Sequence, residues 1–345
     1  MSGDTSIRGA IAKLVEERDL TEDEAAACMR ELMNGDATAA QFGAYATALR
    51  MKGETVDEIV GMARVMREQS SHVSVDGDLL DTCGTGGDAS GSFNVSTCAA
   101  FIAAGAGARI AKHGNRAMSS QCGSADVLEA LGAKIDLTSE QVQACIAQSG
   151  VGFMFAQTFH PAMKHVGPAR REIGIRTVFN LLGPLTNPAG ARLQVLGVAR
   201  PDLVDTLAEA LRRLGSEHAL VVHGDDGYDE VSISGATTIA ELSPEGIRRM
   251  RLTPEDAGLA RHDISSLRGG TPEQNATELR LVLDGAPGPL RDFALINAGA
   301  ALIAWGAASE IAEGVQLAAK SIDSGAAAAK LDAFVRATND VSEAR

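Results

Sequence analysis

From residue 73 onward, short apolar runs end in glycine-rich loops and are followed by segments with helical periodicity. This alternation is the βαβ pattern of a parallel sheet, since parallel strands need a crossover helix between them. The pattern predicts strands at 78–83, 108–111, 151–155, 193–198 and 218–223. The helices expected between them lie at 94–104, 124–131, 139–148 and 202–214. Most of the chain is therefore predicted to be an α/β domain.

The first 70 residues carry helical periodicity only. Three residue pairs have the spacing of a capping box, in which a threonine begins a helix: Thr21/Glu24, Thr38/Gln41 and Thr55/Glu58. Gly35 and Gly53 lie where helices should end. We predict four helices, at about 5–17, 22–33, 39–51 and 56–69. They form a helical domain over 1–72, which part of 158–190 is expected to complete, and the α/β domain runs over 73–345.

Positive charge is concentrated in two segments of an acidic chain, in which 31 Lys and Arg face 45 Asp and Glu for a net charge of -14. Residues 89–125 contain no acid, where the average density predicts roughly five. Residues 173–201 contain none either, and a basic run from His160 to Arg171 precedes them. An anionic small molecule can bind there, whereas the remaining surface would repel a nucleic acid.

The five cysteines are odd in number and never spaced as Cys-x-x-Cys. This usage predicts reduced thiols in the cytoplasm and no structural zinc. The N-terminus has no basic and apolar leader, and no apolar run is long enough for a membrane span, so no membrane association is expected.

Gly84-Thr-Gly86-Gly87-Asp88 follows a predicted strand and precedes a helix. Backbone N–H groups of such a loop can approach a phosphate at the positive end of the helix, although many glycine turns are only tight connections. Three small polar residues follow, which can cap the helix or bind phosphate and metal oxygens: Asn94, Ser96 and Thr97. The loop also fits the dinucleotide pattern, but Lys112-His113 stand where that fold needs an acid for the ribose. The sequence therefore favours a phosphate site.

The segment from Lys112 to Ser120, with Ser124, is too rich in hydrogen-bond donors for a core loop, which leaves a phosphate site or a solvated turn. Asp229-Glu230 follow an apolar strand, and such carboxylates suit Mg²⁺ held mostly by phosphate and water, although acidic loop tips are usually only solvated. Asp225-Asp226 are similar to the acidic pair of the common phosphoribosyltransferase loop, but its Thr-Gly-x-Thr cradle is missing.

His160 and His165 favour structural or surface roles over metal ligation. No Ser/His/Asp or Cys/His set has a plausible context, so no covalent nucleophile is implied.

Five motifs occur in order: GTGGD at 84–88, NVST at 94–97, KHGNRAMSS at 112–120, GSADVLEALG at 123–132 and RTVFNLLGPLTNP at 176–188. Together they resemble the anthranilate phosphoribosyltransferase family of tryptophan biosynthesis, over nearly the entire chain. The resemblance implies a small helical N-terminal domain that forms a homodimer and a larger α/β domain with a mainly parallel central sheet, the fold shared with nucleoside phosphorylases. It implies transfer of a phosphoribosyl group from phosphoribosyl pyrophosphate (PRPP) to the anthranilate amine, with Mg²⁺.

The resemblance also implies the site residues. Those expected around PRPP are Gly84, Gly87, Asp88, Ser92, Asn94, Val95, Ser96, Thr97, Lys112, His113, Gly114, Asn115, Arg116, Ala117, Met118, Ser119, Ser120 and Ser124. Those expected at anthranilate are Gly84, His113, Asn115 and Arg170, and the metal residues are Ser96, Asp229 and Glu230. Lys112, Asn115 and Arg170 are the expected catalytic residues. Gln121-Cys122 and Tyr228 depart from the usual residues of the family.

With no nucleophile evident, we expect a direct displacement, with one domain closing on the other to exclude water. Two alternatives remain. A pyrimidine nucleoside phosphorylase of the same fold would need its own glycine-loop signature, which GTGGD with KHGN fits poorly. A non-enzymatic nucleic-acid-binding relative should be basic, which the net charge of -14 disfavours.

Overall fold

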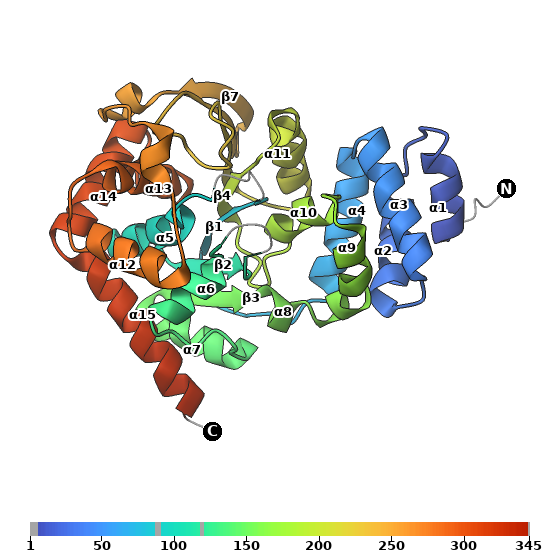
Figure 1. Cartoon of the computed structure of the whole chain (residues 1–345), viewed down its shortest axis with the longest axis horizontal. Coiled ribbons are helices and arrows are strands. Elements are labelled where there is room, and N and C mark those ends of the chain that lie inside the picture. Colours follow the sequence, from blue (N-terminus) through green and yellow to red (C-terminus); the bar gives the residue numbers. More distant parts are fainter. Residues whose placement is uncertain (1–5, 87–90, 118–120, 344–345) are drawn as a thin grey trace.

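The computed structural model describes residues 6–86, 91–117 and 121–343. A helical unit lies at one end of the molecule, and the helices that follow the sheet in sequence lie at the other end (Figure 1). Within the described residues, no helix is both long enough and apolar enough to cross a bilayer.

Four helices build the N-terminal unit: α1 (Ile7–Leu14), α2 (Glu22–Asn34), α3 (Ala39–Lys52) and α4 (Val56–Glu68). The three predicted capping boxes are all present, since each threonine accepts a hydrogen bond from the backbone three residues on and the Glu or Gln there bonds back. Gly35 ends α2 with φ of 80°, a left-handed conformation that glycine adopts without strain, and Gly53 ends α3. The four predicted helices are confirmed.

The central sheet has seven strands in the order β3-β2-β1-β4-β5-β6-β7. The first five in this order are parallel and match the five predicted strands: β1 (Leu80–Gly84), β2 (Ile110–Gly114), β3 (Val151–Phe155), β4 (Leu193–Gly197) and β5 (His218–Gly224). Two antiparallel strands that the sequence analysis did not predict extend one edge: β6 (Thr237–Ser243) and β7 (Gly246–Leu252). The mainly parallel α/β class is confirmed.

The predicted crossover helices are present as α5 (Val95–Gly105), α6 (Ser124–Ala130), α7 (Ser139–Ser149) and α11 (Val204–Arg213). Four further helices follow the sheet: α12 (Pro272–Leu283), α13 (Pro289–Ala304), α14 (Ile311–Asp323) and α15 (Ala326–Glu343). Short helices lie at α8 (Ala156–Phe159), α9 (Gly167–Ile173) and α10 (Phe179–Leu182). Short 3₁₀ turns lie at Pro161–His165, Gly183–Leu185, Pro201–Leu203, Pro254–Ala257 and Ile264–Leu267.

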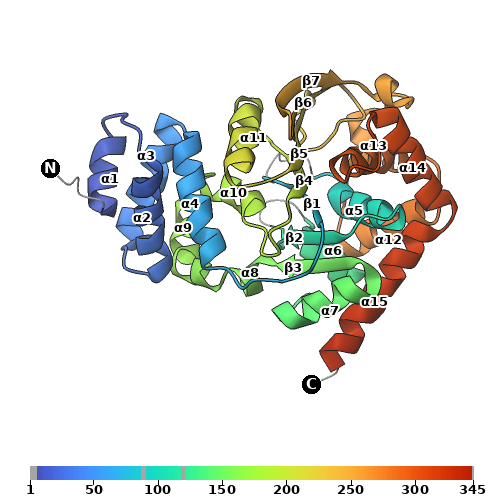
Figure 2. The same cartoon turned by 180° about the vertical axis from the view of Figure 1, so that it is seen from behind.

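The helical unit shares an apolar core with one face of the sheet. That core joins residues of α1–α4 to α11 and to inward-facing residues of β4, β5 and β6. Both views place α11 between the sheet and α4 (Figures 1 and 2). The segment at 158–190 packs here too, because the Phe179 ring lies 5.2 Å from that of Phe42 in α3 and Ala169 of α9 is in the same core. The division into domains at residue 72 stays a prediction.

Candidate active site

Four glycines end four parallel strands at the same edge of the sheet: Gly84, Gly114, Gly197 and Gly224. Ligands of open α/β folds bind at this edge, where the carboxyl ends of parallel strands meet. The glycine loop, the segment after Lys112 and the acidic loop at 225–235 all leave the sheet here. The tertiary structure therefore brings three predicted motifs together that lie far apart in the sequence.

Asp229 lies directly over the glycine loop. Its Oδ2 accepts a hydrogen bond from the Gly86 N–H at 2.7 Å, and the residue is only 7% exposed. A Cβ atom at Gly84 would lie 2.4 Å from Asp229 Oδ2, and one at Gly197 would lie 1.6 Å from the Asp229 carbonyl oxygen. Only glycine at these strand ends leaves room for the carboxylate. The predicted metal residue is thus beside the predicted phosphate loop.

Lys112 points from β2 toward the start of α5. Its side chain is buried, with Nζ hydrogen-bonded to the Thr82 carbonyl oxygen and 3.3 Å from Ser96 Oγ. The Thr82 hydroxyl donates to the Ser96 carbonyl oxygen at 2.9 Å. Lys112, a predicted catalytic residue, and Ser96, a predicted metal residue, therefore meet between β1, β2 and α5.

The helix-capping role expected at one of Asn94, Ser96 and Thr97 is met in position only. Asn94 is the N-cap of α5 but makes no side-chain capping bond, and the other two lie inside the helix. The Asn94 carboxamide instead donates to the Cys122 carbonyl oxygen at 3.2 Å and accepts from Asn275 Nδ2 at 2.7 Å. Its side chain holds the loop before α6 rather than the end of α5. Asn275 is not among the site residues predicted from the sequence.

His113 and His160 form a buried pair, with ring centroids 5.0 Å apart in an edge-to-face arrangement. His113 Nδ1 lies 3.2 Å from the Gly183 carbonyl oxygen. Burial, with the neighbouring His160, lowers the pKa of His113 to about 3, and burial lowers that of His160 to about 4. Both rings are neutral at pH 7. His113 Nε2 and both His160 nitrogens have no hydrogen-bond partner among the described residues.

Asp81 of β1 holds the backbone of His113 and the side chain of Asn187. It is fully buried and accepts hydrogen bonds from the His113 N–H at 3.2 Å and from Asn187 Nδ2 at 2.7 Å. Burial raises the pKa of Asp81, against the opposing effect of nearby Lys112. Neither Asp81 nor Asn187 was a predicted site residue, although Asn187 lies in the RTVFNLLGPLTNP motif and Asp81 lies three residues before the GTGGD motif.

Asp126 holds the two described flanks of the segment between β2 and α6, since its Oδ2 accepts from the N–H groups of Ala117 at 2.9 Å and Gly123 at 2.8 Å. The Arg116 guanidinium pairs with Asp126 and Glu129 and lies over the Phe155 ring. The structure thus directs this predicted PRPP residue toward α6. Asn115 is exposed, and its carbonyl oxygen accepts from Ser124 Oγ at 3.3 Å.

Two arginines lie on the proline-rich segment. Arg170, on α9, has no hydrogen-bond or ion-pair partner for its guanidinium among the residues that the structure describes, and burial lowers its pKa. Arg176, the first residue of the RTVFNLLGPLTNP motif but not one of the predicted site residues, donates to the Gly86 carbonyl oxygen. The acid-free stretch over 173–201 was the available signal for it.

Ser92 forms a backbone bridge with Arg268. Gly87, Asp88, Met118, Ser119 and Ser120 of the predicted site lie outside the described residues.

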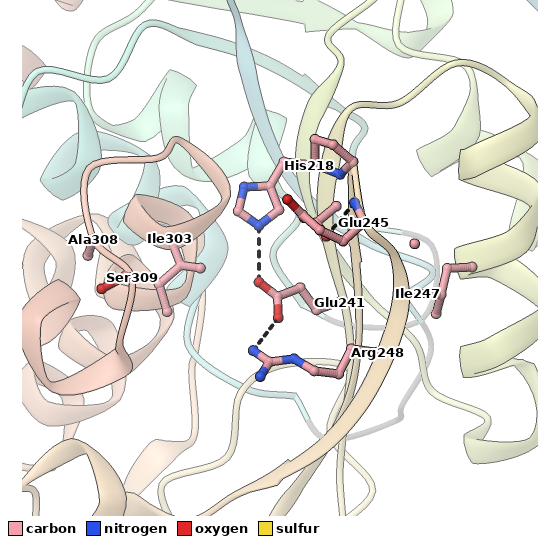
Figure 3. A pocket seen from close by; sticks show the side chains of 11 residues that line it. His218, Glu241, Glu245, Ile247, Arg248, Ile303, Ala308 and Ser309 are labelled. Carbon is pink, nitrogen blue, oxygen red and sulfur yellow. Dashed lines mark hydrogen bonds and ion pairs between the residues drawn. The ribbon is translucent and has the colours of Figure 1, made fainter.

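A hollow of about 550 Å³ lies at the opposite end of the sheet, beside His218, the first residue of β5 (Figure 3). His218 Nε2 lies 3.2 Å from Glu241 Oε1, and Arg248 donates to the other Glu241 oxygen at 2.8 Å. Both basic groups thus face the same carboxylate (Figure 3). None of the predicted site residues lines this hollow, so it is separate from the candidate active site.

Two family models match the chain. One, described as the a/b domain of a glycosyl transferase family, covers residues 76–328, and the other, the helical bundle domain of that family, covers residues 8–70. Together with a glycine loop at the carboxyl edge of a mainly parallel sheet, these matches define a glycosyl transferase.

Particular relatives narrow this class. The chain is 57% identical to the anthranilate phosphoribosyltransferase of Chloroflexus aggregans, over 96% of this chain and 98% of the relative. It is 52% identical to that of Geobacter sp., over 97% and 99%. The crystal structure of the Thermus thermophilus enzyme matches with a TM-score of 0.91 at 46% identity, over 96% and 99% of the two chains. The Saccharomyces cerevisiae enzyme in complex with PRPP and Mg matches at 0.89 and 29% identity, over 97% and 98%.

The chain belongs to the anthranilate phosphoribosyltransferase family. The resemblance seen in the sequence motifs is confirmed, and the two alternative functions are not favoured.

Proposed function

We propose that this protein transfers the 5-phosphoribosyl group of PRPP to the amine of anthranilate, giving N-(5-phosphoribosyl)anthranilate and pyrophosphate in tryptophan biosynthesis. The observation that carries the proposal is the meeting of the Gly84 loop, Lys112 and Asp229 at one sheet edge, in a chain that belongs to this family. The family relationship supports the reaction, and the geometry supports the roles proposed for the residues.

The donor set fits Mg²⁺. Asp229, Glu230 and Ser96 offer only oxygen ligands, and the glycines under Asp229 keep space for its carboxylate. The described residues contain no group of three or more His, Cys, Asp or Glu that could hold a metal by themselves, so PRPP oxygens would complete the coordination. When bound, Mg²⁺ would neutralise part of the charge that develops on pyrophosphate.

The reaction needs position and charge rather than a nucleophile. Lys112, held at the start of α5, would face the departing pyrophosphate together with the backbone N–H groups of the glycine loop. The guanidinium of Arg170, which has no ion-pair partner among the described residues, offers a planar fork for the anthranilate carboxylate. His113 and His160 are neutral at pH 7 and would pack beside the aromatic ring. The arylamine is itself neutral, so no strong base is required.

The activity is tested by following anthranilate fluorescence after addition of protein, PRPP and Mg²⁺. We expect a loss of signal that requires both PRPP and Mg²⁺ and that slows on the order of 100-fold in Arg170→Ala and in Asp229→Ala/Glu230→Ala. Arg171→Ala, an exposed arginine on the same helix, is the matched control and should retain the rate. A wild-type protein that binds PRPP but leaves anthranilate unchanged would show that the acceptor is wrong.

The quaternary structure and location are also proposals. Two large apolar side chains of the helical unit are exposed, Val15 by 67% and Met51 by 83%. They lie after α1 and in α3, at the outer end of the molecule (Figure 1). This supports a homodimer formed through the helical unit. The five free thiols support a cytoplasmic location.

A further inference from the structure

The loop that carries Asp229 and Glu230 is held on both of its flanks by Asp226. Asp226 Oδ1 accepts a hydrogen bond from the Tyr228 N–H at 3.1 Å. Its Oδ2 accepts from the hydroxyls of Ser232 at 2.5 Å and Ser234 at 2.6 Å. One carboxylate therefore closes the loop around Asp229, Glu230 and Val231, which lie between these contacts.

The same loop is fixed from the protein core by Asn297 of α13, which is only 3% exposed. Asn297 Oδ1 accepts from the Val231 N–H, and its Nδ2 donates to the carbonyl oxygens of Val231 and Phe293, each at 2.9 Å. Val231 directly follows Glu230. Both backbone polar groups next to the acidic pair are thus bonded to one buried side chain, whose own donors are all used.

We propose that Asp226 and Asn297 are positioning residues, which hold Asp229 and Glu230 where they bind Mg²⁺ together with PRPP. This inference rests on the proposed function. Asp226 acts from within the loop and Asn297 from the helix behind it. Side chains that orient metal ligands commonly change metal affinity when replaced, although they do not touch the metal.

The measurement is the coupling between Mg²⁺ binding and PRPP binding. PRPP is titrated into the protein in a calorimeter, once in the presence of Mg²⁺ and once in the presence of a chelator. The ratio of the two dissociation constants reports how strongly the metal tightens PRPP binding, and it requires no turnover. A general structural defect would weaken binding in both conditions and leave the ratio unchanged. We expect Asp226→Asn and Asn297→Ala each to lower the ratio about tenfold.

Each variant has a matched control. Asp225→Asn removes the same charge one residue earlier, but the Asp225 side chain is exposed and pairs with Arg251 rather than with the loop. Ser321→Ala removes a buried hydrogen bond to the Ile102 carbonyl oxygen, which lies in the same domain but outside the loop. Both controls should keep the wild-type ratio. Asp226→Asn carries the test if Asn297→Ala does not fold, because Asn cannot accept all three of the Asp226 hydrogen bonds.

The variant Asp229→Asn distinguishes a failure of the metal assignment from a failure of the positioning roles. Two outcomes would overturn the metal assignment in the proposed function and this inference with it. One is a wild-type protein whose PRPP affinity does not change with Mg²⁺, and the other is an Asp229→Asn protein with the wild-type ratio. If Asp229→Asn lowers the ratio while Asp226→Asn and Asn297→Ala match their controls, the metal assignment stands and the positioning roles are overturned.

Discussion

At the scale of single residues, the position of Asp229 in the candidate site depends more on the space left by neighbouring glycines than on charge. Asp229 reaches the glycine loop at Gly86 only because the strand ends beneath it are glycines. The motif around Gly84 was visible in the sequence. The contact of Gly197 with Asp229 was not, because nothing local distinguishes that glycine from the other residues of its predicted strand. A side chain at Gly197 tests how much this approach matters.

We expect Gly197→Ala to displace Asp229, because its Cβ would lie 1.6 Å from the Asp229 carbonyl oxygen. A displacement of about 1 Å at a reacting centre can lower the rate on the order of 100-fold. Steady-state kinetics with varied PRPP measure the effect. Gly43→Ala is the control, since its Cβ would meet only Ile173 at 3.8 Å, and it should leave the rate unchanged. Equal rates for the two variants would contradict the role of this contact.

The two buried histidines predict how stability depends on pH. Burial depresses their pKa values below the ordinary 6.5, so the unfolded state binds more protons in weak acid. The stability is fully present above pH 6.5 and decreases as the pH falls toward about 4 and about 3. At pH 5 the loss is on the order of 2 kcal/mol per histidine.

Urea unfolding at pH 7 and pH 5 measures this loss. The difference between the two pH values should be smaller in His160→Gln than in the wild type, because one titrating group is gone. His165→Gln, an exposed histidine five residues away, should retain the wild-type difference. An equal difference in all three proteins would show that His160 does not titrate as described.

At the scale of elements, local signals predicted what local bonding determines. Each capping box of α2, α3 and α4 spans only four consecutive residues, and all three were predicted from the sequence. The helices α12–α15 were not predicted, although Thr271 and Gln274 form a capping box before α12 with Pro272 in its first turn. The β6–β7 hairpin was missed because β7 is an edge strand with exposed arginines, so its apolar alternation is weak.

Removal of one capping side chain should weaken its helix. Thr38→Ala takes away the bond to the Gln41 N–H and should lower the free energy of unfolding by about 1 kcal/mol. Thr277→Ala is the control, because its hydroxyl bonds a carbonyl oxygen inside α12 and caps nothing. Denaturant titration of the two variants provides the comparison, and equal stabilities would contradict the capping role.

At the scale of the whole molecule, the helical unit is anchored to the α/β part. Arg67 of α4 donates from Nε to the Leu185 carbonyl oxygen at 2.7 Å and from Nη1 to that of Leu214 at 2.9 Å. Arg213 at the end of α11 pairs with Glu22 and Asp57 of the helical unit. Closure of one part on the other would therefore have to break these contacts or carry α11 along.

The exposed apolar end of the helical unit makes the proposed homodimer testable. Val15→Lys/Met51→Lys would place two charges in a buried contact, so we expect this variant to sediment as a monomer where the wild type sediments as a dimer. Leu281→Lys changes a 47% exposed leucine on α12, far from this end, and should remain dimeric. A wild-type monomer would overturn the proposal.

The sequence by itself determined the elements with local signatures: four capped helices, five parallel strands that end in loops, and the motifs that place the chain in its family. These are determined locally because capping, periodicity and glycine turns act within a few residues. Tertiary structure alone decided that Asp81 meets Asn187, that Asn275 holds Asn94 and that Asn297 holds the loop of Asp229. Such contacts join residues more than 60 positions apart, and only the packing of whole helices against the sheet brings them within hydrogen-bond distance.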